Sequence, residues 1–441
     1  MSNRAPPRAR RARRARPPGA PTAAPASAPA SAPAPRIGLA LAGGGPLGAT
    51  WEIGALCAIE DALPGIDLVA LQGYVGVSAG GFIAAALANG MRPRQLCAAF
   101  IENDTPLPDD EISPALFVRP AFGEWFERLA MLPALLAQAG TRLLLNRRSL
   151  TAAVERLGAV LPTGLFGNQA LEARLQRMFT QAGRSDDFRH LRQRGRHLVL
   201  VATDLDSGEV APFGLPGWDA VPISRAVAAS AALPGLFPPV QIAGRHYVDG
   251  ALKKTLHASV LLDQGLDLLI ALNPIVPFDA THALPAQARG RAGERIPHLV
   301  DGGLPLVLSQ TFRALIHSRL QLGLKGYERS HPHTDIVLFE PDQRDPEMFL
   351  ANIFSYSQRR HLAEHAYQKT RADLRARRDL LGRLLARHGL QLDEAALDDP
   401  ARRLLLRQPP PRPRRWHSRL SRSLSRLDKV LDTLEQRLAA G

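Results

Sequence analysis

The chain has 441 residues, 45% of them hydrophobic, and carries 55 Lys and Arg against 41 Asp and Glu, a formal net charge of +14. This composition excludes a fully disordered or collagen-like protein, and two cysteines are too few for a disulfide framework. The excess charge lies at the two ends, because residues 1–36 and 401–441 each carry +8 and the middle carries −2. A neutral middle with 5% aromatic residues argues against a specific nucleic-acid groove.

Residues 1–36 consist mainly of Arg, Pro and Ala. Proline interrupts this stretch too often for the apolar core of a signal peptide, so the composition predicts a disordered basic leader. No uninterrupted apolar run approaches the roughly 18 to 20 residues of a membrane span. We therefore expect a cytoplasmic protein whose basic ends make peripheral contact with the anionic inner face of the membrane.

Strands and helices alternate along the middle of the chain. Strands are predicted over residues 37–42, 73–77, 198–203, 246–248, 268–273 and 335–339, and helices over 49–63, 79–89 and 355–390. Strands that alternate with helices favour a mainly parallel sheet covered on both faces. The predicted fold class is therefore α/β, within one domain over 37–390.

Two further segments follow this domain. Residues 391–415 form a Pro/Arg-rich linker, and 416–441 are predicted to be an amphipathic helix. Its leucines recur at steps of four and three from Leu420 to Leu438, which is a heptad seam. The helix is predicted either to mediate self-association or to lie on anionic lipid.

The pattern Gly76-Val77-Ser78-Ala79-Gly80 stands between a predicted strand and a predicted helix. In this GxSxG setting a serine occupies a tight turn that only small neighbours tolerate, and its hydroxyl is exposed at a helix N-terminus. The pattern predicts a nucleophilic Ser78. The alternative is a small-residue turn that packs a helix on a sheet.

A glycine-rich loop precedes it, with Gly43, Gly44, Gly45 and Gly48 after a predicted strand. Free N–H groups at a glycine-rich helix start can hold the oxyanion of an acyl-transfer intermediate. The loop also fits the GxGxxG pattern with Asp67 about twenty residues on, so dinucleotide binding is an alternative.

A nucleophilic serine needs a base. In the commoner hydrolase design this is a late histidine, and His257, His282, His298 and His317 are candidates. Asp249-Gly250 instead places a carboxylate at a strand tip, where a desolvated carboxylate can take the serine proton directly.

These motifs together resemble the patatin-like phospholipases. The resemblance rests on the glycine-rich loop, the GxSxG serine, residues 229–240 and Asp249-Gly250, in that order, and it covers about residues 37–275. It implies a three-layer α/β/α fold and hydrolysis of fatty acyl esters of phospholipids or related lipids, with no metal or other cofactor. It also implies that Ser78 is the nucleophile and Asp249 the base.

By the same resemblance, the backbone N–H groups of Gly43, Gly44, Gly45 and Gly48 form the oxyanion hole. The family usually has Arg where Leu47 stands here, which leaves rate and head-group contact open. Asp301 in Asp301-Gly302-Gly303 is a second candidate base. A catalytically weak lipid-binding or membrane-scaffold protein on the same fold is the alternative function.

Two other patterns each have a structural explanation as well as a functional one. His361 and His365 fit HxxEH, a zinc pattern, but two histidines on the polar face of a charged helix need no metal. Residues 129–141 are uncharged, so 129–145 is predicted to be either a lid over the site or an ordinary core helix.

Overall fold

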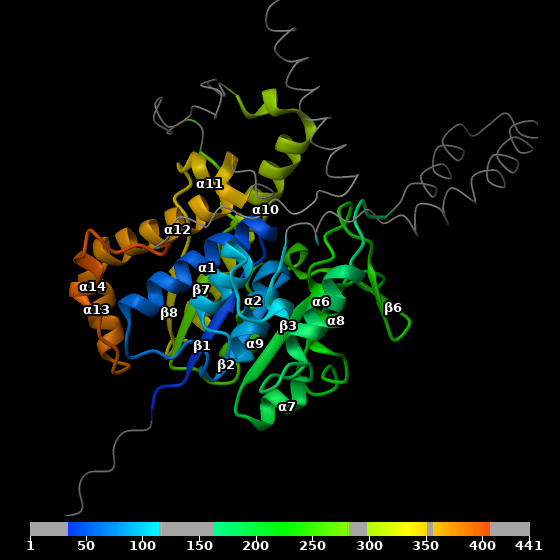
Figure 1. The fold of residues 1–441 in the computed structure, drawn as a ribbon, viewed down its shortest axis with the longest axis horizontal. Helices are drawn as coiled ribbons and strands as arrows, with labels where there is room; N and C mark the ends of the chain where they lie inside the picture. The colour runs from blue at the N-terminus through cyan, green and yellow to red at the C-terminus, as the bar shows by residue number, and fades with distance from the viewer. Residues whose placement is uncertain are drawn as a thin grey trace, which may run out of the picture. The chain divides into compact units, whose positions relative to one another are not determined.

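The computed structural model describes residues 34–113, 116, 163–279, 281, 298–350 and 356–405 (Figure 1). The predicted lid, the heptad helix, His282 and nearly all of the basic leader lie outside these ranges.

The described strands form one mixed sheet in the order β5-β6-β3-β2-β1-β7-β8, with β4 paired to β3. Parallel pairing joins five of the strands, which are β1 (Ile37–Leu41), β2 (Gly73–Val77), β3 (His197–Asp204), β7 (Leu268–Leu272) and β8 (Asp335–Phe339). Antiparallel pairing joins β4 (Val210–Phe213), β5 (Val240–Ile242) and β6 (Arg245–Asp249) to that group. The six predicted strands are confirmed, whereas β4 and β5 were not predicted.

The sheet is buried on both faces. Alternate residues of β1 enter different cores, since Leu39 and Leu41 belong to one cluster and Ala40 to the other. Every residue of β1 and β7 is buried, which explains their nearly continuous apolar sequences. The α/β prediction, with helices on both faces of a mainly parallel sheet, is confirmed.

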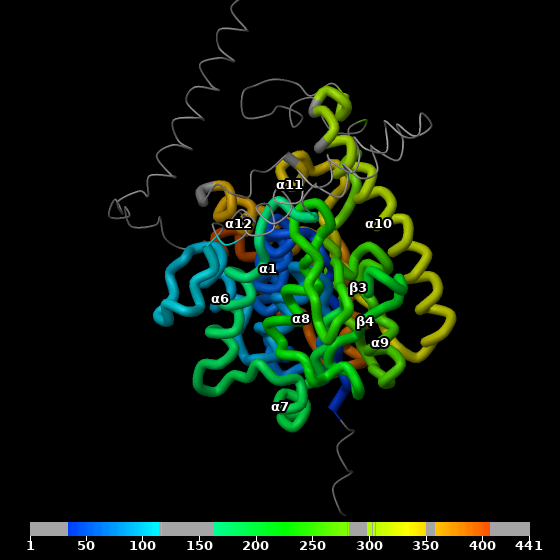
Figure 2. Tube along the Cα trace, turned by 90° about the vertical axis from the view of Figure 1, so that its right-hand side faces the viewer, coloured from blue at the N-terminus to red at the C-terminus, as the bar shows by residue number. Residues whose placement is uncertain are grey.

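The helices divide between these two cores (Figure 2). The first core contains α1 (Gly45–Ala62), α2 (Ser78–Ala88), α6 (Gln169–Phe179), α7 (Phe188–Gln193), α8 (Ile223–Ser230) and α12 (Tyr356–Ala376). The second contains α9 (Ser259–Leu262) and α10 (Gly303–Ser330). Shorter helices also contribute to the first core, and they are α3 (Pro93–Leu96), the π-helix η1 (Cys97–Glu102), α11 (Pro346–Leu350), α13 (Arg378–Ala386) and α14 (Glu394–Asp398). The short helix η4 (Gly250–Leu252) contributes to the second core. Two further short helices are η2 (Pro108–Asp110) and η5 (Leu299–Gly302).

The prediction of one helix over 355–390 was wrong, because α12 ends at Ala376 and α13 begins at Arg378. Arg377 lies at the junction, where its guanidinium donates to the Leu338 carbonyl at 3.2 Å and lies 5.0 Å from the centre of the Phe339 ring. These contacts with β8 tie the junction to the sheet. The 28-residue α10 was not predicted at all.

Helix α12 packs closely on α1. A Cβ on Gly54 would lie 2.4 Å from the Ala363 carbonyl oxygen, so only glycine permits this approach. Packing continues past residue 390, since Glu364 accepts hydrogen bonds from the N–H groups of Leu404 and Leu405, both at 3.0 Å. None of the helices in the described ranges is long and apolar enough to cross a membrane.

Candidate active site

Ser78 stands at the turn between β2 and α2, with φ of +54°, a value that non-glycine residues rarely adopt. The turn is tight on both sides. A Cβ on Gly76 would lie 2.5 Å from the Gly80 carbonyl oxygen, and one on Gly80 would lie 2.3 Å from the Ala42 carbonyl oxygen. The glycines of GxSxG are therefore required by close backbone approach, and the strained serine conformation is the one expected of a nucleophile elbow.

The backbone of this turn is fixed by two contacts. The Ser78 N–H donates to the Ser230 hydroxyl at 2.8 Å, and that hydroxyl donates to the Val201 carbonyl at 2.6 Å. The Gly80 N–H donates to the Ala42 carbonyl at 3.1 Å, next to the glycine-rich loop. Ser230 is completely buried at the end of α8. It lies in the stretch 229–240 that supports the family resemblance, but the sequence assigned it no role.

Asp249 reaches Ser78 through the register of the sheet. Val77 pairs with Val201 across β2 and β3, and Asp249 pairs with Ala202, the next residue of β3. The chain then crosses the end of β3, where a Cβ on Gly250 would lie 2.3 Å from the Val201 carbonyl oxygen. Glycine after Asp249 is thus what lets the carboxylate approach the serine.

The Asp249 carboxyl is 3% exposed and accepts hydrogen bonds from the Ser78 side chain and, at 2.8 Å, from the Ala251 N–H. Burial raises the pKa of Asp249 to about 6, against the lowering effect of these two hydrogen bonds. A carboxylate with this pKa is ionised at neutral pH and is a stronger base than an exposed aspartate.

The glycine-rich loop lies directly beside the serine, since a Cβ on Gly43 would lie 3.1 Å from Ser78 Cβ and 3.7 Å from Ser78 Oγ. Gly44 and Gly45 have φ of +150° and +60°, which favour glycine. Among the residues that the structure describes, none accepts a hydrogen bond from the N–H groups of Gly43, Gly44 or Gly45. These donors stand at the start of α1, where the helix dipole favours negative charge.

The fourth predicted donor does not fit. The Gly48 N–H donates to the Gly44 carbonyl at 2.9 Å within the first turn of α1. That bond occupies the Gly48 N–H. Of the four predicted donors, only Gly43, Gly44 and Gly45 thus have an N–H without an acceptor among the described residues. Leu47, where the family usually has Arg, is partly buried and packs against the first core.

The histidines that the structure describes lie outside the serine contacts. Of the histidines in the described ranges, none hydrogen-bonds to Ser78 or Asp249. His257 is 2% exposed, its Nε2 lies 3.3 Å from the Gly250 carbonyl oxygen, and burial lowers its pKa to about 4. It supports the turn that follows Asp249.

The other candidate residues lie in different surroundings. Asp301 is exposed in η5. Asp67 precedes β2 and pairs with Arg92 at 3.4 Å. In a dinucleotide-binding fold the carboxylate that binds the ribose follows the second strand. Asp67 is therefore not in the position that dinucleotide binding requires. His361 and His365 bind the Glu347 carboxylate at 2.7 and 3.2 Å. No group of three or more His, Cys, Asp or Glu within the described residues could hold a metal ion.

Comparison with known proteins gives one family match and several structural neighbours. A family model described as "Patatin-like phospholipase" matches residues 39–262, which is half of the chain. That range contains Ser78, Asp249 and the glycine-rich loop, and it confirms the resemblance found in the sequence.

The structural neighbours include VipD from Legionella pneumophila, with 16% identity, 76% of this chain and 68% of VipD covered, and a TM-score of 0.32. The type III effector protein ExoU has 15% identity, 78% and 53% coverage, and a TM-score of 0.34. A complex of full-length SpcU with full-length ExoU from Pseudomonas aeruginosa has 19% identity, 66% and 53% coverage, and a TM-score of 0.24. The chain thus spans about half the length of the two ExoU chains.

Proposed function

The chain belongs to the patatin-like phospholipase family of lipid acyl hydrolases, and from that premise we propose that it cleaves fatty acyl esters of phospholipids with a Ser78-Asp249 dyad. The observation that supports this most directly is the hydrogen bond between the strained Ser78 and the buried Asp249 carboxylate, beside three glycine N–H groups. No histidine, metal or other cofactor enters the proposal.

In the proposed first half-reaction, Asp249 takes the proton of the Ser78 hydroxyl while Ser78 Oγ attacks the acyl carbonyl carbon. The N–H groups of Gly43, Gly44 and Gly45 stabilise the negative oxygen of the tetrahedral intermediate. When the intermediate collapses, the ester C–O bond breaks and the leaving alcohol oxygen takes the proton from Asp249. The products are the free lysolipid alcohol and an acyl-enzyme on Ser78.

The second half-reaction repeats these roles with water. Asp249 takes a proton from the attacking water, the same N–H groups stabilise the second tetrahedral intermediate, and the proton then returns to Ser78 Oγ as the fatty acid leaves. The raised pKa of Asp249, about 6, supports this dual role because the group can both accept and release a proton near neutral pH.

Labelling by a fluorophosphonate together with hydrolysis of a phospholipid panel tests the proposal. Ser78→Ala should abolish both labelling and hydrolysis, whereas Ser207→Ala, an exposed serine in the turn after β3, should change neither. Undiminished hydrolysis in Ser78→Ala would contradict the dyad. Full vesicle binding with no turnover on any ester would favour a lipid-binding scaffold instead.

The proposal also covers the lipid that the protein binds and the membrane surface on which it acts. The substrate partner is a phospholipid or another acyl-ester lipid, met by peripheral contact of the basic ends with an anionic membrane on its cytoplasmic side. Self-association through residues 416–441 stays a prediction. Fractionation of cells that produce the full chain, with and without a high-salt wash, tests the membrane contact.

A further inference from the structure

Helix α10 exposes large apolar side chains along one face. The exposed fractions are 70% for Leu304, 46% for Leu308, 50% for Phe312, 49% for Leu315 and 69% for Leu322. At 100° per residue these five positions fall within an arc of about 80° on the helix. We call them the α10 apolar face. Single exposed leucines are ordinary, but an aligned set along a 28-residue helix is not.

The opposite side of the same helix holds it on the protein. Leu320 is buried in the second core, and Leu324 and Tyr327 pack against that core. Near the start of the helix, the Gln310 amide donates to the Phe278 carbonyl at 2.8 Å. The helix is therefore anchored through one side, and the α10 apolar face points away from the core.

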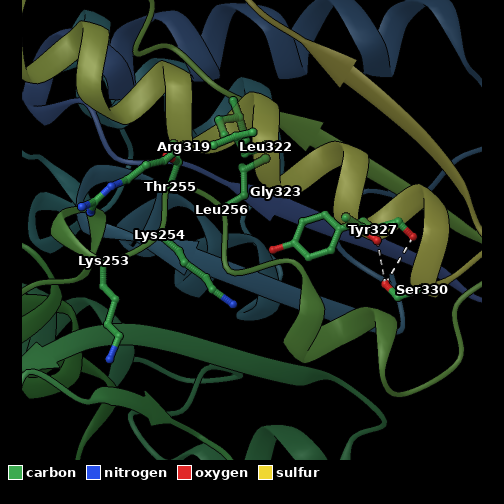
Figure 3. Close-up of a pocket in the computed structure, with 11 residues that line it drawn as sticks. Lys253, Lys254, Thr255, Leu256, Arg319, Leu322, Gly323, Tyr327 and Ser330 are labelled. Carbon is green, nitrogen blue, oxygen red and sulfur yellow. Dashed lines mark hydrogen bonds between the residues drawn. The ribbon is translucent and has the colours of Figure 1, made fainter.

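A basic pocket borders this face at its C-terminal end (Figure 3). It has a volume of about 550 Å³ and lies between α10 and residues 253–256, which closely follow Asp249. Lys253, Lys254 and Arg319 line it, and none of the lining residues is acidic. Leu322 belongs both to this lining and to the α10 apolar face, so the two features are continuous.

The three cationic side chains of the pocket differ in whether they already have hydrogen-bond partners. Lys253 Nζ donates to the Gly208 carbonyl at 2.6 Å, and Arg319 donates to the Leu252 carbonyl at 2.7 Å. Lys254 Nζ has no hydrogen-bond or ion-pair partner in the part of the chain that the structure describes. In Figure 3 it extends into the space between residues 253–256 and α10, on the side of Tyr327. Lys254 is thus available to an external anion.

We propose that the α10 apolar face and the basic pocket together form a docking surface for an anionic phospholipid bilayer. Leu304, Leu308, Phe312, Leu315 and Leu322 enter the boundary between head groups and acyl chains, and Lys254 binds a lipid phosphate.

The charge of the surroundings favours a membrane over another protein. The exposed cations of α10 are Arg319, Lys325 and Arg329, against the single acid Glu328. Arg313 points inward, where it donates to the Val276 carbonyl at 3.3 Å. Two copies of such a surface would repel one another, whereas an anionic leaflet attracts each cation that lies near it. A soluble polyanion would match the cations but would leave the apolar face in water. The family's lipid substrates make a bilayer the surface on which such an enzyme works.

Vesicle flotation of the full-length protein tests this surface. All proteins contain Ser78→Ala, so that hydrolysis by the proposed dyad does not alter the vesicles. Partitioning is scored without a turnover readout, so it can fail or succeed separately from the dyad. Vesicles of phosphatidylcholine, alone or mixed with phosphatidylserine, separate the apolar from the ionic contribution. The double variant Phe312→Ser/Leu315→Ser should lower partitioning to both vesicles by about tenfold or more. Lys254→Gln should lower only the gain from phosphatidylserine, by about fivefold.

Matched controls lie elsewhere on the molecule. Leu380→Ser on α13 removes a leucine that is 58% exposed, and Lys369→Gln removes an exposed lysine of α12. Both variants should partition like the parent protein. The pair Leu304→Ser/Leu308→Ser repeats the test at the other end of the α10 apolar face, should Phe312→Ser/Leu315→Ser fail to fold. Unchanged partitioning in a folded double variant would overturn the proposal. So would a dimer of the parent protein that dissociates in the double variant while vesicle binding stays the same.

Discussion

The N–H of Ser78 and the hydroxyl of Ser230 are joined by a 2.8 Å hydrogen bond across 152 residues of sequence. Because the same hydroxyl donates to the Val201 carbonyl at the end of β3, Ser230 links the strained turn to the sheet. The bond does not touch the reacting atoms. It holds the conformation with φ of +54° that presents Ser78 to Asp249.

We therefore expect Ser230→Ala to lower kcat by about tenfold with little change in KM, because positioning affects the chemical step. It leaves a buried donor and a buried acceptor unpaired, which should also destabilise the protein by about 1 to 3 kcal/mol. Ser224→Ala is the matched control, since Ser224 is a buried serine of the same helix whose hydroxyl donates to Asp186 at 2.7 Å. A kcat loss in Ser224→Ala as large as that in Ser230→Ala would assign the effect to general destabilisation.

Activity should depend on the ionisation of Asp249. With its pKa at about 6, the base is protonated below that pH and kcat/KM should fall about tenfold for each pH unit below 6. A pH profile with a soluble ester measures this. The profile of Asp249→Asn should be low and flat, and a wild-type profile with no break between pH 5 and pH 7 would contradict the assignment.

Stability should move in the opposite direction. The folded pKa of Asp249 is raised to about 6 from the 3.8 of an exposed carboxyl, so between these values the folded state binds more protons than the unfolded state and stability falls as pH rises. Asp249→Asn removes this loss. Its free energy of unfolding relative to the wild type should therefore increase by about 2 kcal/mol between pH 4 and pH 7. Urea unfolding at both pH values measures the difference, and a constant difference would show that Asp249 does not titrate this way.

Gly80 and Gly43, which both lie beside Ser78, should respond differently to alanine. Gly80→Ala places Cβ 2.3 Å from a backbone oxygen that cannot move away, so it should destabilise the fold by more than about 3 kcal/mol. Gly43→Ala places Cβ 3.1 Å from Ser78 Cβ, a contact that a small shift relieves. We expect near-normal stability and a kcat reduced by about tenfold or more, because the shift moves a proposed oxyanion donor. Thermal unfolding and ester kinetics on both variants separate the two outcomes.

Local patterns were enough to propose Ser78 and Asp249, whose side chains the fold brings into hydrogen-bond contact. A nucleophile turn and a carboxylate at a strand tip each require particular neighbours in sequence. The contact of Ser230 with Ser78 was not predicted, because the two residues are distant in sequence. An isolated serine in an alanine-rich helix has no local signature. Gly48 was predicted to be an oxyanion donor, but its N–H is bonded to the Gly44 carbonyl within α1. Helical hydrogen bonding begins one turn after Gly44, and the glycine pattern alone does not show where that turn starts.

In the fold as well, elements with a clear local pattern were predicted and elements without one were not. Strands that are buried on both faces, such as β1 and β7, have continuous apolar sequences and were predicted. The three-residue β5 is too short to show a period, and β4 includes Pro212, which weakens its strand signal. Helix α10 has apolar residues on its buried side and on its exposed side, so no single amphipathic stripe marked it.

The partners of β1 and α1 have a consequence for the order of folding. The glycine-rich loop connects β1 to α1. Strand β1 pairs with β7 and α1 packs on α12, and both partners lie beyond the family match at 39–262. During synthesis, more than two hundred residues must be added after β1 before its neighbour β7 leaves the ribosome. Contacts so distant in sequence form late. The hydrolase should therefore stay inactive as a nascent chain until its C-terminal third has been made.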